Sequence, residues 1–256
     1  LSQGVKPEHS VKLLFVGDEE VGSKYGIQYL IENESLFAPG DVILVPDAGD
    51  SEGSEIEVAE KNVLWLKLST HGKQAHASRP QQGVNAFLAA SDLVMRTANL
   101  KNLFSKTDEL FQPPVSTISP TKKEANVPNV NTIPGEDVFY LDCRILPVYP
   151  LKQVLSEIDR LIKEVESEYG VSIDYEIVQR MESNPTPSDC KLVSKLSNAV
   201  RDVYGVAAKT VGIGGGTVAA HLRNAGHDTV VWARIDETAH QANEYCKIEN
   251  LTGDAC

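Results

Sequence analysis

Three adjacent carboxylates, Asp18, Glu19 and Glu20, come directly after an apolar run at residues 11–17. Side chains of the same charge at this spacing repel one another unless a cation neutralises them. A divalent metal would do so, and since neighbouring side chains of an extended loop diverge, one carboxylate could bind the metal while the next faces a water molecule that the metal activates. The same residues could also be the solvated acidic start of a helix, where the helix dipole favours negative charge.

Two further segments carry side chains that can bind a metal. Asp47 lies in the acidic segment 46–50, after a second apolar run, although aspartate and glycine are also common in ordinary turns. His240 lies in the polar segment 236–245, where a lone histidine could equally be an exposed surface residue. Carboxylates combined with a histidine suit zinc or its neighbours among the divalent metals.

The elements that must position these side chains follow from the apolar pattern. The runs at residues 11–17 and 41–46 are typical of strands buried on both faces of a parallel sheet. Between them, apolar side chains at helical spacing predict a helix at residues 24–34. Because ligands of open α/β sheets bind beyond the carboxyl ends of the strands, we expect the two acidic segments at one edge of the sheet.

The pattern changes after residue 61. The order becomes β-α-β-β-α-β, which is the ferredoxin-like arrangement, with strands expected at 63–69, 115–120, 138–146 and 171–178 and helices at 84–97 and 151–168. A linker is expected at residues 181–187, a helix at 192–204 and a short strand at 229–232. We therefore predict an α/β fold with a mixed-sheet catalytic domain in two pieces, residues 1–61 and 180–256, and a ferredoxin-like α+β domain inserted at residues 62–179.

Composition excludes several classes of function. A net charge of -12 disfavours phosphate backbones and anionic lipids, so neither nucleic acid nor membrane is an expected partner. No run approaches the eighteen apolar residues of a membrane span. The four cysteines are far apart and contain no C-x-x-C pair, which favours a reducing cytoplasmic location. The H-E-x-x-H motif of other hydrolases is absent from the sequence.

Several segments together resemble one family, the dinuclear metallohydrolases that include acetylornithine deacetylase, succinyl-diaminopimelate desuccinylase, aminoacylase and glutamate carboxypeptidases. The resemblance covers nearly the whole chain and rests on DEEVGS at 18–23, PDAG at 46–49, GKQAHAS at 72–78, NTIPG at 131–135, DCR at 142–144, GGGT at 214–217 and ETAHQANEY at 237–245. It implies a catalytic domain of the phosphorylase/hydrolase-like type and an inserted lid that also forms the dimer.

The resemblance also implies the roles of the metal-site residues. Glu19 would be the general base. Glu20 and His240 would bind one metal ion and Asp47 the other. The two divalent ions would be zinc, with cobalt or manganese as alternatives.

The remaining implied roles concern the substrate. His76 would reach into the partner subunit's site of a homodimer and help to bind the oxyanion. Asn131 and Arg144 would bind substrate, since a guanidinium suits a carboxylate, although Arg144 could also be a surface charge. The backbone amides of Gly215, Gly216 and Thr217 would approach the substrate carboxylate.

The sequence departs from the family in one respect. The family has an H-x-D segment and a metal-bridging aspartate before the DEE motif, whereas none of the six histidines here is followed by aspartate two positions later. The preferred interpretation is a fragment of a longer enzyme, which by itself binds no metal ion or one. The alternative of another class is a non-catalytic module that dimerises through the inserted domain.

The expected reaction is hydrolysis of the amide bond of a small N-acyl amino acid, as in succinyl-diaminopimelate desuccinylase of lysine biosynthesis or acetylornithine deacetylase of arginine biosynthesis. A carboxypeptidase-like dipeptidase is the alternative.

Overall fold

The computed structural model describes residues 10–255, in two units, Leu1–Asp41 and Val42–Cys256. The described part of the first unit contains a 3-10 turn, Glu19–Val21, and helix α1, Ile27–Asn33, where a helix was predicted. The buried strand predicted at residues 11–17 is wrong, because this segment has no regular structure, and Leu13 and Phe15 are 77% and 94% exposed. A strand forms only where a neighbour pairs with its backbone, and no described strand pairs here.

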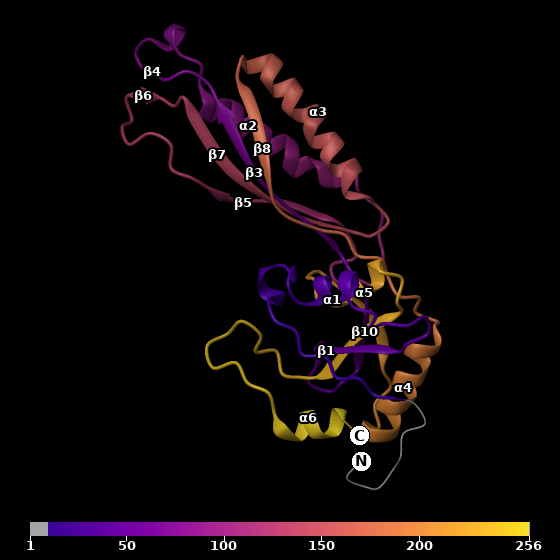
Figure 1. Ribbon diagram of the computed structural model, residues 1–256. Helices are drawn as coiled ribbons and strands as arrows, with labels where there is room; N and C mark the ends of the chain where they lie inside the picture. Colours follow the sequence, from indigo (N-terminus) through magenta and orange to yellow (C-terminus); the bar gives the residue numbers. More distant parts are fainter. Residues whose placement is uncertain (1–9, 256) are drawn as a thin grey trace. The chain divides into compact units, whose positions relative to one another are not determined.

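The second unit contains a four-stranded sheet, called here the mixed sheet, in the order β1-β10-β2-β9 (Figure 1). Its strands are β1 (Ile43–Asp50), β10 (Thr229–Arg234), β2 (Glu55–Glu60) and β9 (Lys209–Ile213). β1 runs parallel to β10 and β2 runs parallel to β9, whereas β10 and β2 are antiparallel. Helix α4 (Lys191–Tyr204) packs its apolar side against this sheet, burying Leu192, Val193 and Val200 against Ile56, Val58, Val230 and Trp232.

A second sheet, called here the lid sheet, has the order β5-β7-β3-β8 and is antiparallel throughout. Its strands are β3 (Asn62–His71), β5 (Thr117–Lys123), β7 (Glu136–Ile145) and β8 (Ser172–Met181), and its helices are α2 (Ala86–Asn99) and α3 (Leu151–Tyr169). Both helices cover one face and share one apolar core with β3 and β7 (Figure 1). The strand order confirms the ferredoxin-like arrangement, and the mixed α/β fold class is confirmed with it.

Shorter elements complete the second unit. β4 (Ala75–His76) and β6 (Thr132–Ile133) form a two-stranded sheet, and 3-10 turns lie at Pro80–Gln82 and Leu100–Asn102. Helices α5 (Ala219–Asn224) and α6 (Ile248–Asp254) flank β10 in the sequence. Of the helices that the structure describes, none is both long and apolar enough to cross a membrane.

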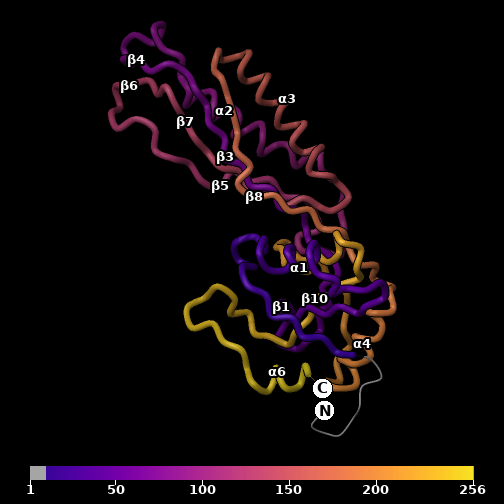
Figure 2. Tube along the Cα trace, in the orientation of Figure 1, coloured from indigo at the N-terminus to yellow at the C-terminus, as the bar shows by residue number. Residues whose placement is uncertain are grey.

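The chain passes between the two sheets twice, after β2 and after β8 (Figure 2). The first passage consists of Glu60, Lys61 and Asn62, which are all buried although all are polar. The Lys61 ammonium donates to the Pro113 carbonyl at 2.8 Å, and the Asn62 side chain accepts from the Ser183 amide at 3.0 Å. Because Ser183 lies in the second passage, Asn62 ties the two passages together.

Candidate functional site

Asp18 begins a tight turn in the first unit, with a φ of 60°. Its carbonyl accepts from the Ser23 amide at 2.8 Å, and its Oδ2 accepts from the Tyr25 amide at 2.7 Å. Glu19 and Glu20 then occupy successive positions of the 3-10 turn, so their side chains leave it about 120° apart. Divergent directions suit the two different roles predicted for them.

Asp47 lies within β1, not in the loop that was predicted, because the strand continues to Asp50. The pairing is irregular at this point: from Val45 to Gly49 the chain advances four residues, while its partner advances two, from Val231 to Ala233. Such a bulge redirects side chains and is common beside active sites. Asp47 is exposed at this bulge.

His240 lies in the predicted polar loop after β10, with a φ of 60°. Its backbone amide donates to Glu244 Oε2 at 3.0 Å. Lys247 closes the base of the loop by donating to Asp236 Oδ1 at 3.1 Å, and this contact lowers the pKa of the Asp236 carboxyl. Because β1 and β10 are parallel neighbours, Asp47 and the His240 loop belong to strands that end at the same edge of the mixed sheet.

The predicted ligands are divided between the two units. Glu20 belongs to the first unit, and Asp47 and His240 belong to the second. Over residues 10–255 no group of three or more His, Cys, Asp or Glu side chains is arranged to hold a metal ion. The three-ligand site therefore stays a prediction. Its donor set of carboxylate oxygens and an imidazole nitrogen does fit zinc chemically.

The structure brings Arg144 and the glycine loop, residues 214–217, together. Arg144 extends from β7 and donates to the Gly214 carbonyl at 2.9 Å. Asp142 holds its guanidinium through two hydrogen bonds of 2.8 and 3.1 Å, and the Trp65 ring lies 5.6 Å away. Arg144 is thus a half-buried group fixed over a candidate binding loop, not a freely solvated surface charge.

His76, the last residue of β4, and Asn131, the residue before β6, also lie together, and both are exposed. The Ala77 amide donates to the Asn131 carbonyl at 2.8 Å. The Ser78 amide points at His76 Nδ1 over 3.1 Å. An amide only donates, so Nδ1 is the acceptor and the neutral ring carries its proton on Nε2, where it can be donated to an oxyanion.

His76 and Arg144 stand at opposite ends of the lid sheet. Arg144 pairs with Val63, and β3 continues eight residues further to His71 before the chain reaches His76. At the usual rise of a strand those eight steps span about 26 Å. One small substrate therefore cannot touch both residues of the same chain.

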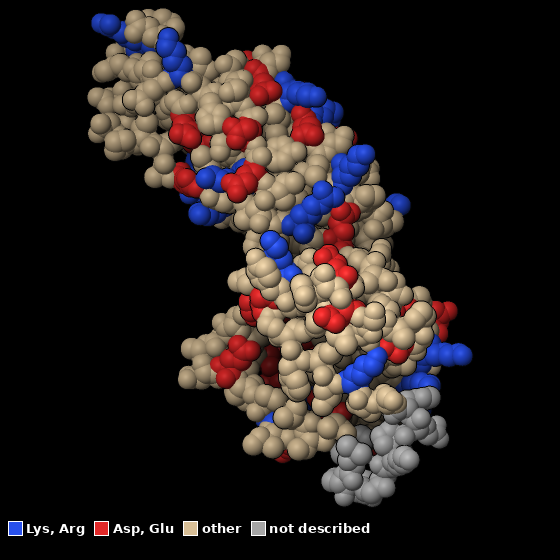
Figure 3. Space-filling view, viewed as in Figure 1, with Lys and Arg blue, Asp and Glu red and all other residues tan. Residues whose placement is uncertain are grey.

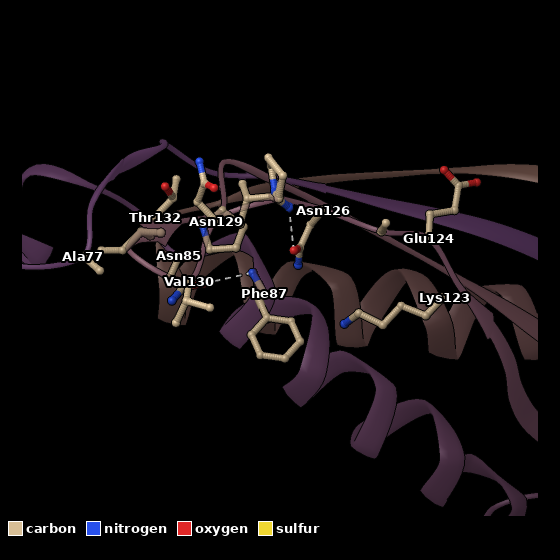
Figure 4. A pocket seen from close by; sticks show the side chains of 14 residues that line it. Ala77, Asn85, Phe87, Lys123, Glu124, Asn126, Asn129, Val130 and Thr132 are labelled. Carbon is tan, nitrogen blue, oxygen red and sulfur yellow. Dashed lines mark hydrogen bonds between the residues drawn. The ribbon is translucent and has the colours of Figure 1, made fainter.

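A pocket of about 580 Å³ lies beside His76 and Asn131, lined by their neighbours Ala77 and Thr132. Figure 4 shows Phe87 of α2 and Lys123 of β5 on the same side of it, and the Lys123 ammonium lies 4.2 Å from the ring centroid of Phe87. On the face drawn in Figure 3, basic and acidic side chains are interspersed over the lid.

Sequence reasoning missed a buried group of charged side chains where β2 of the mixed sheet meets α5. Arg223 of α5 donates to Glu57 Oε1 at 2.9 Å, and lies 3.5 Å from Glu60 Oε1. Burial raises the pKa of Glu57 and of Glu60 to about 7 each, the charge of Glu57 adding to the rise at Glu60 and that of Asp47 to the rise at Glu57. The signal in the sequence was the segment EIEVAE at 55–60, in which Glu57 and Glu60 lie among Ile56, Val58 and Ala59.

Comparison with known proteins gives three results. The peptidase dimerisation domain of the M20 group matches residues 58–170. An uncharacterized metallohydrolase of Methanococcus maripaludis is 42% identical, and one of Methanocaldococcus jannaschii is 39% identical, each over 96% of this chain and 63% of its own length. A succinyl-diaminopimelate desuccinylase of Sulfurimonas denitrificans is 24% identical over 92% of this chain and 62% of its own. This chain thus spans less than two thirds of these curated relatives.

Solved structures agree on the fold. Aminopeptidase PepT of Bacillus cereus matches with a TM-score of 0.76 and 21% identity over 94% of this chain and 60% of its own. A tripeptidase of Staphylococcus aureus matches with a TM-score of 0.72 and 20% identity over 91% and 59%. By sequence, residues 58–170 match the peptidase dimerisation domain of the M20 group, in a chain whose relatives are metallohydrolases and, more distantly, succinyl-diaminopimelate desuccinylases.

Proposed function

We propose that this protein is a metal-dependent hydrolase that cleaves the amide bond of a small N-acyl amino acid, of the succinyl-diaminopimelate desuccinylase or acetylornithine deacetylase type. The observation that carries the proposal is the parallel pairing of β1 with β10, which brings the strand of Asp47 and the loop of His240 to one sheet edge. Homology to metallohydrolases supports the reaction class, and the more distant desuccinylases support the substrate class.

In this proposal Glu20 and His240 hold one divalent ion and Asp47 contributes to a second, with zinc preferred over cobalt or manganese. The bound ions supply Lewis acidity for the amide carbonyl and for water. Glu19 accepts a proton from the attacking water and delivers it to the leaving amine. The divergence of Glu19 from Glu20 in one turn supports this division of roles. Three ligands are too few for two ions, so the chain of 256 residues alone should hold one ion or none.

The substrate carboxylate on the amine side would be bound by Arg144 and by the backbone amides of Gly215, Gly216 and Thr217. A guanidinium matches a carboxylate with two parallel hydrogen bonds. The contact of Arg144 with the Gly214 carbonyl supports this pairing of side chain and loop.

His76 and Asn131 would act in the site of a second copy. The length of β3 between Arg144 and His76 supports this, since one substrate cannot reach both within a single chain. The Nε2–H of His76 would donate a hydrogen bond to the oxyanion. A homodimer formed through the lid follows from the proposal, and the matched dimerisation domain supports it.

The test uses the protein expressed from its complete reading frame. We expect hydrolysis of N-succinyl-diaminopimelate or N-acetylornithine that a chelator removes and added zinc restores. Glu19→Gln should lower kcat by about a thousandfold or more with the metal content unchanged, since it removes the base. Glu32→Gln, an exposed residue of α1, is the matched control and should keep full activity.

Two results would redirect the assignment. Hydrolysis of a glutamyl dipeptide in preference to both N-acyl amino acids would favour the dipeptidase. A stable dimer without any metal-dependent hydrolysis would favour the non-catalytic dimerising module.

A further inference from the structure

A buried carboxylate with no predicted role lies directly beneath the glycine loop. Glu60, the last residue of β2, is fully buried. Its Oε1 accepts a hydrogen bond from the Thr217 hydroxyl at 2.8 Å. Its Oε2 has no hydrogen-bond partner among the described residues. A buried charge of this kind is costly to the fold, so its retention calls for a reason.

The glycine loop is held at both ends by side chains from other elements. At its start Arg144 donates to the Gly214 carbonyl, and at its end Glu60 holds Thr217. The Thr217 hydroxyl also accepts from the amide of Ala219, the first residue of α5, at 3.1 Å, so this hydroxyl links Glu60 to the start of that helix. These contacts leave the two residues in the middle of the loop, 215 and 216, as the span between fixed points.

At two positions of this loop, 214 and 215, the packing of the loop does not require glycine. A Cβ added at Gly214 or Gly215 would meet no heavy atom within 4 Å, and neither residue has the positive φ that favours glycine. A side chain would therefore fit within the described structure. Glycine at such positions leaves the backbone amides open to a close approach by another molecule. The loop thus has fixed ends and is open at Gly215, whereas Met181 packs against Gly216.

Glu60 itself is fixed from below. Arg223 lies 3.5 Å from Glu60 Oε1 and is held in turn by Glu57 at 2.9 Å and by the Thr229 carbonyl at 2.9 Å. A Cβ added at Gly216 would lie 3.6 Å from Glu60 Oε2, which shows how closely this carboxylate underlies the loop. The anchor is therefore continuous from the mixed sheet to the loop.

We propose that Glu60 is a positioning residue that sets the glycine loop for the substrate carboxylate by holding the Thr217 hydroxyl. This rests on the proposed function, in which the loop amides bind that carboxylate. Glu60 does not touch the substrate, and its contribution is to reduce the freedom that the loop must lose on binding. Its removal should therefore weaken binding and leave the chemical step nearly unchanged.

The experiment compares Glu60→Gln, which keeps an oxygen that accepts from Thr217, with Glu60→Leu, which has a similar volume and no acceptor. Glu55→Gln, from the outer end of the same strand, is the control. Amide hydrogen exchange of residues 214–219 is measured on the 256-residue chain, and KM and kcat on the protein from the complete reading frame. Glu60→Leu should speed the exchange and raise KM, each by about tenfold, with kcat within about threefold. Glu60→Gln and Glu55→Gln should stay near wild type.

The two readouts separate the inference from the proposed function. If no substrate is hydrolysed, the proposed function fails, and the exchange of residues 214–219 still tests the role of Glu60. Unchanged exchange in Glu60→Leu would overturn the inference. So would a rise of the exchange rate and of KM in Glu60→Gln as large as in Glu60→Leu. If Glu60→Leu does not fold, Thr217→Val removes the same hydrogen bond from the other side. Faster exchange in Thr217→Val then supports the inference, and unchanged exchange contradicts it.

Discussion

The two four-stranded sheets of the second unit bury different kinds of side chain. The lid sheet and its helices share an apolar core, in which β3 contributes Leu64, Leu66 and Leu68. The mixed sheet buries Glu57, Glu60 and Arg223 beside a smaller apolar cluster. In the lid the buried Asp137 of β7 pairs with Lys123, whose side chain is partly exposed, and Arg96 bridges Asp92 and Glu168 at the surface.

This difference indicates what each sheet is for. Apolar burial stabilises the lid without regard to the chemistry of the site, which suits a frame that carries His76 at its tip. Buried charges are a costly way to stabilise a sheet, and replacing them by apolar groups is often neutral or favourable. Their presence beneath the glycine loop therefore favours a role in positioning.

The largest expected effect breaks the buried charge group. Arg223→Met leaves Glu57 and Glu60 buried without their cation, and should lower the free energy of unfolding by about 3–5 kcal/mol. Arg96→Met in the lid removes ion pairs to Asp92 and Glu168 that water screens, and should cost about 1 kcal/mol or less. Urea denaturation measures both, and equal losses would remove the contrast between the sheets.

An effect of intermediate size concerns pH. The pKa of Glu60 is about 7 in the folded protein against a model value of 4.5, so the folded state binds more protons between these values. Its stability contribution is present below about pH 4.5 and is lost as the pH rises through about 7. Glu60→Gln lacks this loss. Relative to wild type, its free energy of unfolding should rise by on the order of 2 kcal/mol from about pH 5 to about pH 8.

Thermal or urea denaturation across this pH range checks the sign. Parallel pH profiles for wild type and Glu60→Gln would mean that Glu60 titrates normally, and that the mixed sheet does not differ from the lid in this respect.

The smallest expected effect lies in the lid. Asn85 is the N-cap of α2, and its Oδ1 accepts from the Phe87 amide at 3.0 Å and the Leu88 amide at 3.3 Å. Asn85→Ala should cost about 1 kcal/mol, and Asn85→Asp should restore most of it because aspartate caps equally well. A loss above about 3 kcal/mol would show that the lid also depends on polar contacts.

The lid could be predicted from the sequence because its signals are local. β3 alternates between buried and half-buried residues along its length, and α3 presents Val154, Ile158, Leu161 and Val165 at helical spacing to the core. In the mixed sheet the same reasoning missed β2 and β9, which are short and carry no strong periodicity. It also placed Asp47 in a loop, because a bulge inside a strand has the composition of a turn.

For the candidate site the sequence proposes a set of residues, and it does not give their geometry. The contact of Arg144 with Gly214 joins positions 70 residues apart, and the contact of Glu60 with Thr217 joins positions 157 apart. Such pairings depend on tertiary packing, which no local pattern encodes. The failed strand at residues 11–17 has the same cause, since apolar composition does not specify a pairing partner.

The most direct test of the central claim is the metal content of the protein from its complete reading frame, with Asp47→Asn and His240→Asn beside the exposed control Glu52→Gln. The account predicts about two zinc ions per chain in wild type and control, and about one or fewer in each of the two variants, with activity lost in step. Wild-type metal content in both variants would contradict the assignment of Asp47 and His240 as ligands.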